Sequence, residues 1–196
     1  MATAQLVSVN VALPREVPWR GRRIRTGFFK EPATGTRQVR SEGLEGDGVG
    51  DPHSHGGPRK CVYAYPSEHY PYWCGELGLE RLPWGSFGEN LSLRGVTESD
   101  VRPGDRLEVG TALFEVTQPR TPCFKMNLRF GREDMVRRFA RAGRSGFYLG
   151  VVRPGALAAG DQVLFHLGTG VGPTIDEQFR ASMQRPVDPA AEFEDE

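Results

Sequence analysis

The chain has 196 residues, and its 25 basic and 25 acidic side chains give a formal net charge of zero. This balance argues against a general polyanion-binding surface and against nucleic acid as a partner. A hydrophobic content of 38 % supports one sizeable core with a short appendage. No apolar stretch approaches the ~20 residues that span a bilayer, and the N-terminus lacks the pattern of a signal peptide, so we expect no membrane partner.

The first half of the chain predicts mainly strands. Apolar and polar residues alternate over residues 6–11, and residues 26–30 and 36–39 are predicted to form the next pair of strands around a turn. The arginines between positions 20 and 25 are typical of a solvated strand or loop face, with an anionic cofactor as an alternative user. Residues 61–65 predict a buried strand, followed by a helix with Ser67 as N-cap and Gly78 as its end.

The second half predicts a hairpin and two helices. Residues 107–109 and 112–117 flank a Gly-Thr turn as two strands of a hairpin. A helix is predicted over residues 133–142, and strands over 147–151 and 162–165 close the sheet. Thr174 and Glu177 form a capping-box pattern at the start of a last helix, and the acidic, proline-containing end predicts disorder.

Cys123 ends the run Gln-Pro-Arg-Thr-Pro-Cys directly after the second strand of the predicted hairpin. The prolines stiffen this loop, and Arg120 and Lys125 place positive charge on both sides of the thiol. Such a field favours the thiolate, which is the form of cysteine that binds metals or acts as a nucleophile. The alternative for a single cysteine is a small buried apolar residue.

Two glycine-containing segments carry further polar residues. Residues 46–60 read GDGVGDPHSHGGPRK, in which the glycines allow backbone N–H groups close to an anion and the last two residues add charge. Residues 85–91 read GSFGENL. Asp47, Asp51 and Glu89 are candidate acids for proton transfer, although carboxylates beside glycine are also ordinary turn residues.

In this order, the strings GDGVGDPHSHGGPRKCVYAYPSEHY, GSFGENL, RPGDRLEVG and QPRTPCFK resemble the MOSC domain, the C-terminal domain of molybdenum cofactor sulfurases, over about residues 6–167. PSEHYPYW and residues 127–150 look like the small free-standing bacterial members that reduce N-hydroxylated bases. The resemblance implies a mainly β fold with a few helices. It places a MOSC-type β-barrel at residues 1–167. The change of sequence character after residue 167 predicts a linker, short helix and disordered acidic tail at 168–196. In the family that the chain resembles, close relatives usually carry a small helical domain after the barrel.

The resemblance also implies a site that holds the molybdenum–pterin cofactor, with the Cys123 thiolate as the metal ligand. Cys123, Glu89 and Asp51 are expected to take part in the chemistry. The residues expected to bind the cofactor match the family's HGG, GEN and PRxPC strings or add charge beside them: His55, Gly56, Gly57, Arg59, Lys60, Glu89, Asn90 and Arg120. The implied protein is a molybdenum-dependent oxidoreductase that acts on N-hydroxylated bases or amidoximes. Its expected partners are a small-molecule substrate and an electron-donor reductase, with a homodimer as an option.

The same residues allow other interpretations. Cys123 of a sulfur- or cofactor-carrier module would hold a persulfide or pass on the cofactor, and a barrel without activity is a third interpretation. His53 and His55, with Cys61 or His69, are an alternative zinc-ligand set, although no CxxC frame accompanies them. Three cysteines are too few and oddly numbered for a disulfide framework, which predicts a cytoplasmic protein.

Overall fold

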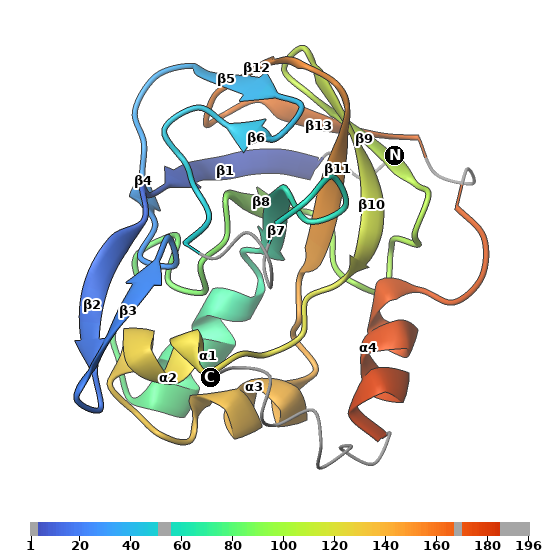
Figure 1. The fold of residues 1–196 in the computed structure, drawn as a ribbon. Coiled ribbons are helices and arrows are strands. Elements are labelled where there is room, and N and C mark those ends of the chain that lie inside the picture. Colours follow the sequence, from blue (N-terminus) through green and yellow to red (C-terminus); the bar gives the residue numbers. More distant parts are fainter. Residues whose placement is uncertain (1–3, 51–55, 167–169, 185–196) are drawn as a thin grey trace.

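Seven strands close into a β-barrel at the centre of the molecule (Figure 1). The structure is a computed structural model that describes residues 4–50, 56–166 and 170–184. The barrel strands are hydrogen-bonded in the order β13-β9-β10-β11-β7-β8-β1, and β13 pairs with β1 to close the ring. They are β1 (Ala4–Val11), β7 (Val62–Pro66), β8 (Leu91–Arg94), β9 (Arg106–Val109), β10 (Ala112–Pro119), β11 (Phe147–Arg153) and β13 (Gln162–His166). The expected mainly β barrel is therefore confirmed.

The remaining strands lie outside the closed ring. β4 (Glu31–Pro32) pairs with β1, while β5 (Arg37–Arg40), β6 (Gly43–Leu44) and β12 (Gly155–Leu157) form a three-stranded sheet. β2 (Arg15–Trp19) and β3 (Arg22–Thr26) form a separate hairpin.

The predicted pairing of residues 26–30 with 36–39 is wrong, because β3 pairs with β2 and β5 pairs with β6 and β12. The physical reason is the turn at Arg20 and Gly21. These residues have φ values of 49° and 77°, as a tight two-residue hairpin turn requires, so the arginine-rich segment folds back on itself.

Four helices accompany the barrel in the described residues: α1 (His69–Leu77), α2 (Lys125–Phe130), α3 (Met135–Ala142) and α4 (Ile175–Gln184). The sequence predicts all of them except α2. Gly78 and Gly143 end α1 and α3 in the left-handed conformation, as predicted. Ser67 is not the N-cap of α1. The helix begins at His69, so the N-cap position falls on Glu68. No helix in the described residues is long and apolar enough to cross a membrane.

Two groups of buried apolar side chains stabilise this arrangement. One fills the barrel, and the other packs aromatic rings between the barrel and the helices. Phe87 lies at the centre of the second group, with ring centres of Tyr65, Trp73 and Phe130 at 4.8, 5.3 and 5.4 Å. Because Phe87 belongs to the GSFGENL loop, this packing fixes the loop against the end of the barrel.

Helix α4 belongs to the packed structure. The capping box is formed, since the Thr174 Oγ1 accepts a hydrogen bond from the Glu177 N–H at 3.2 Å and Glu177 accepts one from the Thr174 N–H at 2.8 Å. Ile175 and Phe179 are buried, each in one of the two apolar groups, whereas Met183 is exposed. The helix after residue 170 therefore covers the barrel with one apolar face.

Candidate active site

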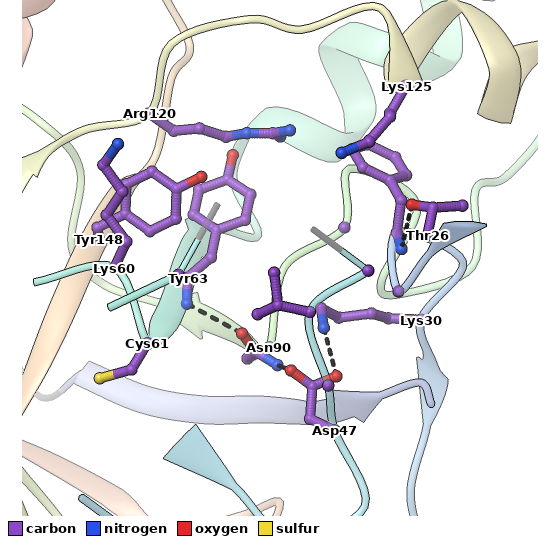
Figure 2. A pocket seen from close by; sticks show the side chains of 17 residues that line it. Thr26, Lys30, Asp47, Lys60, Cys61, Tyr63, Asn90, Arg120, Lys125 and Tyr148 are labelled. Carbon is purple, nitrogen blue, oxygen red and sulfur yellow. Dashed lines mark hydrogen bonds and ion pairs between the residues drawn. The ribbon is translucent and has the colours of Figure 1, made fainter. Parts of the chain in front are cut away.

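A cavity of about 90 Å³ lies where loops from distant parts of the chain meet at the barrel (Figure 2). Its wall includes several glycines of the 46–60 segment and two tyrosine rings. The polar side chains that line it come from separate segments of the sequence: Thr26, Lys30, Asp47, Lys60, Asn90, Arg120, Lys125 and the phenols of Tyr63 and Tyr148. Four of these are cationic and one is a carboxylate, so the cavity suits an anionic group.

The glycines of the loop allow backbone to pack on backbone. A Cβ atom on Gly27 would lie 2.1 Å from the Gly48 carbonyl oxygen, and one on Gly50 would lie 2.3 Å from the Arg25 carbonyl oxygen. No side chain fits at either place. The sequence predicts glycines of the 46–60 segment for close approach to an anion. The structure shows that one of them, Gly50, together with Gly27 after β3, serves the approach of this loop to the end of β3.

Arg120 is the most constrained cation of the cavity. Its side chain is buried, and Nη1 donates a hydrogen bond to the Phe87 carbonyl oxygen at 2.9 Å. The guanidinium also lies over the rings of Tyr63 and Phe28, at 4.9 and 5.1 Å from their centres. Within the described residues its buried Nε has no hydrogen-bond partner. A buried N–H without a partner is costly, so this atom is a candidate contact for a bound anion.

Cys123 lies directly beside this guanidinium. Arg120 Nη2 donates to Cys123 Sγ at 3.6 Å, and the thiol is half-buried between the end of β10 and the start of α2. Burial lowers the pKa of Arg120, but the neighbouring Tyr148, Tyr63 and Cys123 outweigh burial and raise it. The arginine is therefore a permanent cation next to the thiol. Such a neighbour stabilises the negative charge of a thiolate.

Lys30 and Asp47 form a buried ion pair on another wall of the cavity, with side chains 8 % and 9 % exposed. Burial lowers the pKa of Lys30, against the attraction of Asp47. The carboxylate also accepts hydrogen bonds from the Ala12 N–H at 2.9 Å and from Asn90 Nδ2 at 2.8 Å. Asp47 therefore neutralises a buried lysine and ties the glycine-rich loop to the residue that follows β1 and to the GEN segment.

The side chains of Asn90 and Glu89 form hydrogen bonds to other groups of the protein. Asn90 Oδ1 accepts from the Tyr63 N–H at 3.0 Å, while Nδ2 donates to Asp47 and, at 3.2 Å, to the Asn10 carbonyl oxygen. Asn90 still lines the cavity, whereas Glu89 is fully buried away from it.

The carboxylate of Glu89 accepts hydrogen bonds from the Tyr70 hydroxyl, the Gly85 and Phe87 N–H groups and the Ser92 hydroxyl. These bonds hold the loop that presents the Phe87 carbonyl oxygen to Arg120. The geometry thus gives Glu89 a role in positioning Arg120, one step away from the cavity.

The buried Glu89 predicts a pH dependence of stability. Burial raises the pKa of Glu89 above the ordinary value of 4.5. Its contribution to the free energy of unfolding is then fully present below pH 4.5 and is lost as the pH rises through the raised pKa. Chemical denaturation at a series of pH values above 4.5 measures the free energy of unfolding. This free energy should fall less with rising pH for Glu89→Gln than for the unmodified protein. Glu80→Gln, at an exposed position, is the control and should leave the slope unchanged.

The structure brings together part of the predicted site. Gly56 and Lys60 line the cavity with Asn90 and Arg120, and Cys123 lies beside Arg120. Gly57 and Arg59 are exposed, and Arg59 Nη2 donates to the Thr117 carbonyl oxygen at 3.4 Å.

Asp51 and His55 lie outside the described residues, as does His53. The sequence pattern did not single out Lys30, Tyr63 or Tyr148 as site residues. Only Tyr63 had a local signal, its place in the strand that leaves the glycine-rich loop.

The alternative zinc ligands have other partners where the structure describes them. His69 Nε2 lies 2.8 Å from Glu98, and its Nδ1 lies 2.9 Å from Arg144 Nη1, which can only donate. Cys61 Sγ donates to the Leu149 carbonyl oxygen at 3.4 Å, and burial raises the pKa of this thiol. Residues 4–50, 56–166 and 170–184 contain no cluster of three His, Cys, Asp or Glu side chains that would hold a metal ion.

The structure therefore defines a small β-barrel protein with a cationic cavity where its loops meet and with the free thiol of Cys123 beside Arg120. Residues 51–164 match the family described as MOSC domain, and the chain belongs to this family.

It is 40 % identical over 156 residues to YflK of Bacillus subtilis, a match that covers 79 % of this chain and 70 % of that protein. A protein of Gibberella moniliformis named reductase is 33 % identical over 149 residues, covering 73 % of this chain and 26 % of the longer protein. The crystal structure of YiiM from Geobacillus stearothermophilus has a TM-score of 0.73 at 31 % identity, covering 92 % of this chain and 84 % of that one.

Proposed function

We propose that this chain binds the molybdenum–pterin cofactor and reduces N-hydroxylated bases or amidoximes. The observation that carries the proposal is the pair formed by Cys123 Sγ and the buried guanidinium of Arg120, 3.6 Å apart. The MOSC family is associated with this cofactor in general, and one relative is named a reductase. Both facts are consistent with an oxidoreductase and support the proposal.

The residues present fit the chemistry of this cofactor. A thiolate is a soft ligand of the kind that transition metals accept, and Cys123 would supply it. Arg120, with its Nε free of protein partners in the described residues, would face the anionic sulfur or phosphate groups, as would Lys60. The cavity of about 90 Å³ is smaller than a whole pterin, and the adjoining residues 51–55 lie outside the described part of the chain.

The proposed reaction converts R–NH–OH, two electrons and two protons into R–NH₂ and water. When bound, the cofactor supplies a metal centre that accepts oxygen and stores the electrons. The protein binds and orients the reactants and supplies a fixed electrostatic environment. Tyr148 contributes a hydroxyl to the cavity wall, and because burial raises the pKa of this phenol, its proton stays on Oη at neutral pH.

Analysis of freshly purified protein tests the proposal. Molybdenum and the fluorescent oxidation product of the pterin should be present in equal amounts, and dithionite should drive reduction of an amidoxime. Turnover that requires the molybdenum-loaded protein supports the reductase. Bound cofactor without any turnover, together with transfer of cofactor or sulfur from Cys123 to an acceptor protein, would instead establish the carrier module. Absence of molybdenum after expression in a cofactor-producing host would refute the reductase and the cofactor carrier, and transfer of sulfur from Cys123 to an acceptor protein would then establish a sulfur carrier.

Arg120 provides a graded test of cofactor binding. Loss of a charge-assisted contact commonly costs about 1.5–3 kcal/mol, so Arg120→Ala should lower molybdenum occupancy about tenfold or more. Arg59→Ala is the control, since Arg59 is exposed and lies outside the cavity wall. The molybdenum occupancy of this variant should stay near that of the unmodified protein. Equal occupancy in the two variants would remove Arg120 from the binding site.

A further inference from the structure

The hairpin formed by β2 and β3 is set apart from the rest of the molecule. It is a separate two-stranded sheet that extends beside α2, away from the barrel (Figure 1). An isolated hairpin is marginally stable in water, and its apolar residues Val17, Trp19 and Ile24 are only half-buried. The hairpin is not one of the strands that close the barrel, so barrel closure does not account for it.

The charge of the hairpin is unusual for this chain. Residues 15–25 contain five arginines and one glutamate, a net charge of +4 in a protein whose total is zero. Arg23 pairs with Glu16 and Arg20 pairs with Glu133, but these side chains are between 55 % and 80 % exposed, so the pairs are weak. Arg22 and Arg25 are exposed and have no side-chain partner within the described residues. The hairpin therefore presents unneutralised positive charge to solvent.

This basic surface continues to the candidate active site. Arg15 of the hairpin and Arg129 of α2 lie on the same ring, at 5.0 and 5.1 Å from the centre of Phe29. Helix α2 begins two residues after Cys123, and Thr26, the last residue of β3, lines the cavity. A protein bound along the hairpin and α2 would therefore lie at the edge of the site.

We infer that the β2–β3 hairpin and α2 form the docking surface for a small acidic redox protein that supplies electrons to the site. The inference rests on the proposed reductase function, which consumes two electrons in each turnover. The occupant is identified by charge complementarity, because electrostatic steering speeds encounter between oppositely charged surfaces, and transient redox contacts bury less than about 1,200 Å². A polyanionic ligand would also be attracted, and an oligonucleotide probe separates that case.

A charge-reversal experiment tests this surface with flavodoxin, an acidic FMN protein, as the probe. Each flavodoxin hydroquinone gives up one electron and becomes the semiquinone. Two of them supply the electrons that convert R–NH–OH into R–NH₂ and water, and the protons come from solvent. In stopped-flow measurements at about 0.05 M salt, Arg22→Glu/Arg25→Glu should lower the second-order rate of electron transfer about tenfold or more. At about 0.5 M salt the difference should nearly vanish.

A matched control has the same charge change elsewhere. Arg94 and Arg106 are exposed strand residues without side-chain partners in the described residues. Arg94 pairs with Gln5 near the start of β1, whereas the hairpin follows the end of β1. Arg94→Glu/Arg106→Glu should keep the flavodoxin rate within about twofold of the unmodified protein. Equal effects of both double variants, or none from the hairpin variant, would overturn the inference.

Two further measurements distinguish a lost docking surface from a lost reaction and from nucleic-acid binding. Turnover driven by dithionite should be the same in all variants, since a small reductant needs no docking surface. If dithionite drives no turnover, the proposed function fails, and flavodoxin affinity measured by fluorescence still decides whether the hairpin binds acidic protein. Binding of a labelled single-stranded oligonucleotide that is tighter than flavodoxin binding and lost in the hairpin variant would assign the surface to nucleic acid and reject the inference.

Discussion

Cys123→Ser is expected to abolish dithionite-driven reduction of an amidoxime while leaving the fold intact. A hydroxyl is a poor ligand for a soft metal, whereas a cysteine sulfur is a ligand of the kind that such a metal accepts. The structural effect should be small, because the side chain is half-buried and changes by one atom. Circular dichroism and the denaturation midpoint should match those of the unmodified protein.

The other two cysteines are matched controls for this variant. Cys61 lies on the cavity wall and Cys74 is on α1, whereas the hydrogen bond from Arg120 to a cysteine goes to Cys123. Cys61→Ser and Cys74→Ser should retain molybdenum and most of the activity. If all three variants lose activity equally, general destabilisation explains the loss and Cys123 is not the metal ligand.

Asp47→Ala is expected to lower the free energy of unfolding by about 3–5 kcal/mol, because it leaves the buried Lys30 ammonium without its counter-ion. Urea denaturation at neutral pH measures this loss. Burial already lowers the pKa of Lys30 below 10.5, and an unpaired lysine would be more easily deprotonated. The unfolded chain then binds more protons than the folded one, so the variant should regain stability as the pH rises toward 10.5.

Two comparisons make the Asp47 result specific. Glu16→Ala removes one partner of an exposed pair, whose carboxylate side chain is 55 % exposed, and should change stability by less than about 1 kcal/mol. Lys30→Met/Asp47→Ala removes both buried charges and should recover much of the loss, since a buried pair can often be replaced by apolar groups at little cost. A similar small loss for Asp47→Ala and Glu16→Ala would contradict the buried pair.

The sequence predicts most barrel strands because their burial follows the simple alternation of side chains along a strand. In β10, Ala112, Phe114 and Val116 point into the core and the residues between them are more exposed. The strands β2 and β3 do not show this alternation of apolar and polar residues, because charged residues occupy both faces of their hairpin. Helix α2 is short and follows two prolines, so it has too few residues to show a helical period.

Prediction of the site succeeds where neighbours in space are neighbours in sequence. Arg120 and Cys123 are three residues apart, and their contact follows from one stiff loop. Lys30 and Asp47 meet only because the glycine-rich loop folds onto the end of β3, which no local pattern encodes. The GEN string predicts Glu89 at the cofactor, but the burial and hydrogen bonds of Glu89 depend on the packing of Tyr70 and Phe87 around it.

The pairing of β1 with β13 sets the order in which this protein can form during synthesis. Ala4 and Val163 are register partners, so the first residues of β1 have no strand to pair with on this edge until nearly the whole barrel has been synthesised. Until then the backbone N–H and C=O groups along that edge are open to pairing with another chain. The growing chain should therefore depend on chaperones or rapid translation more than a protein built from local contacts, and stalling before residue 163 should favour aggregation.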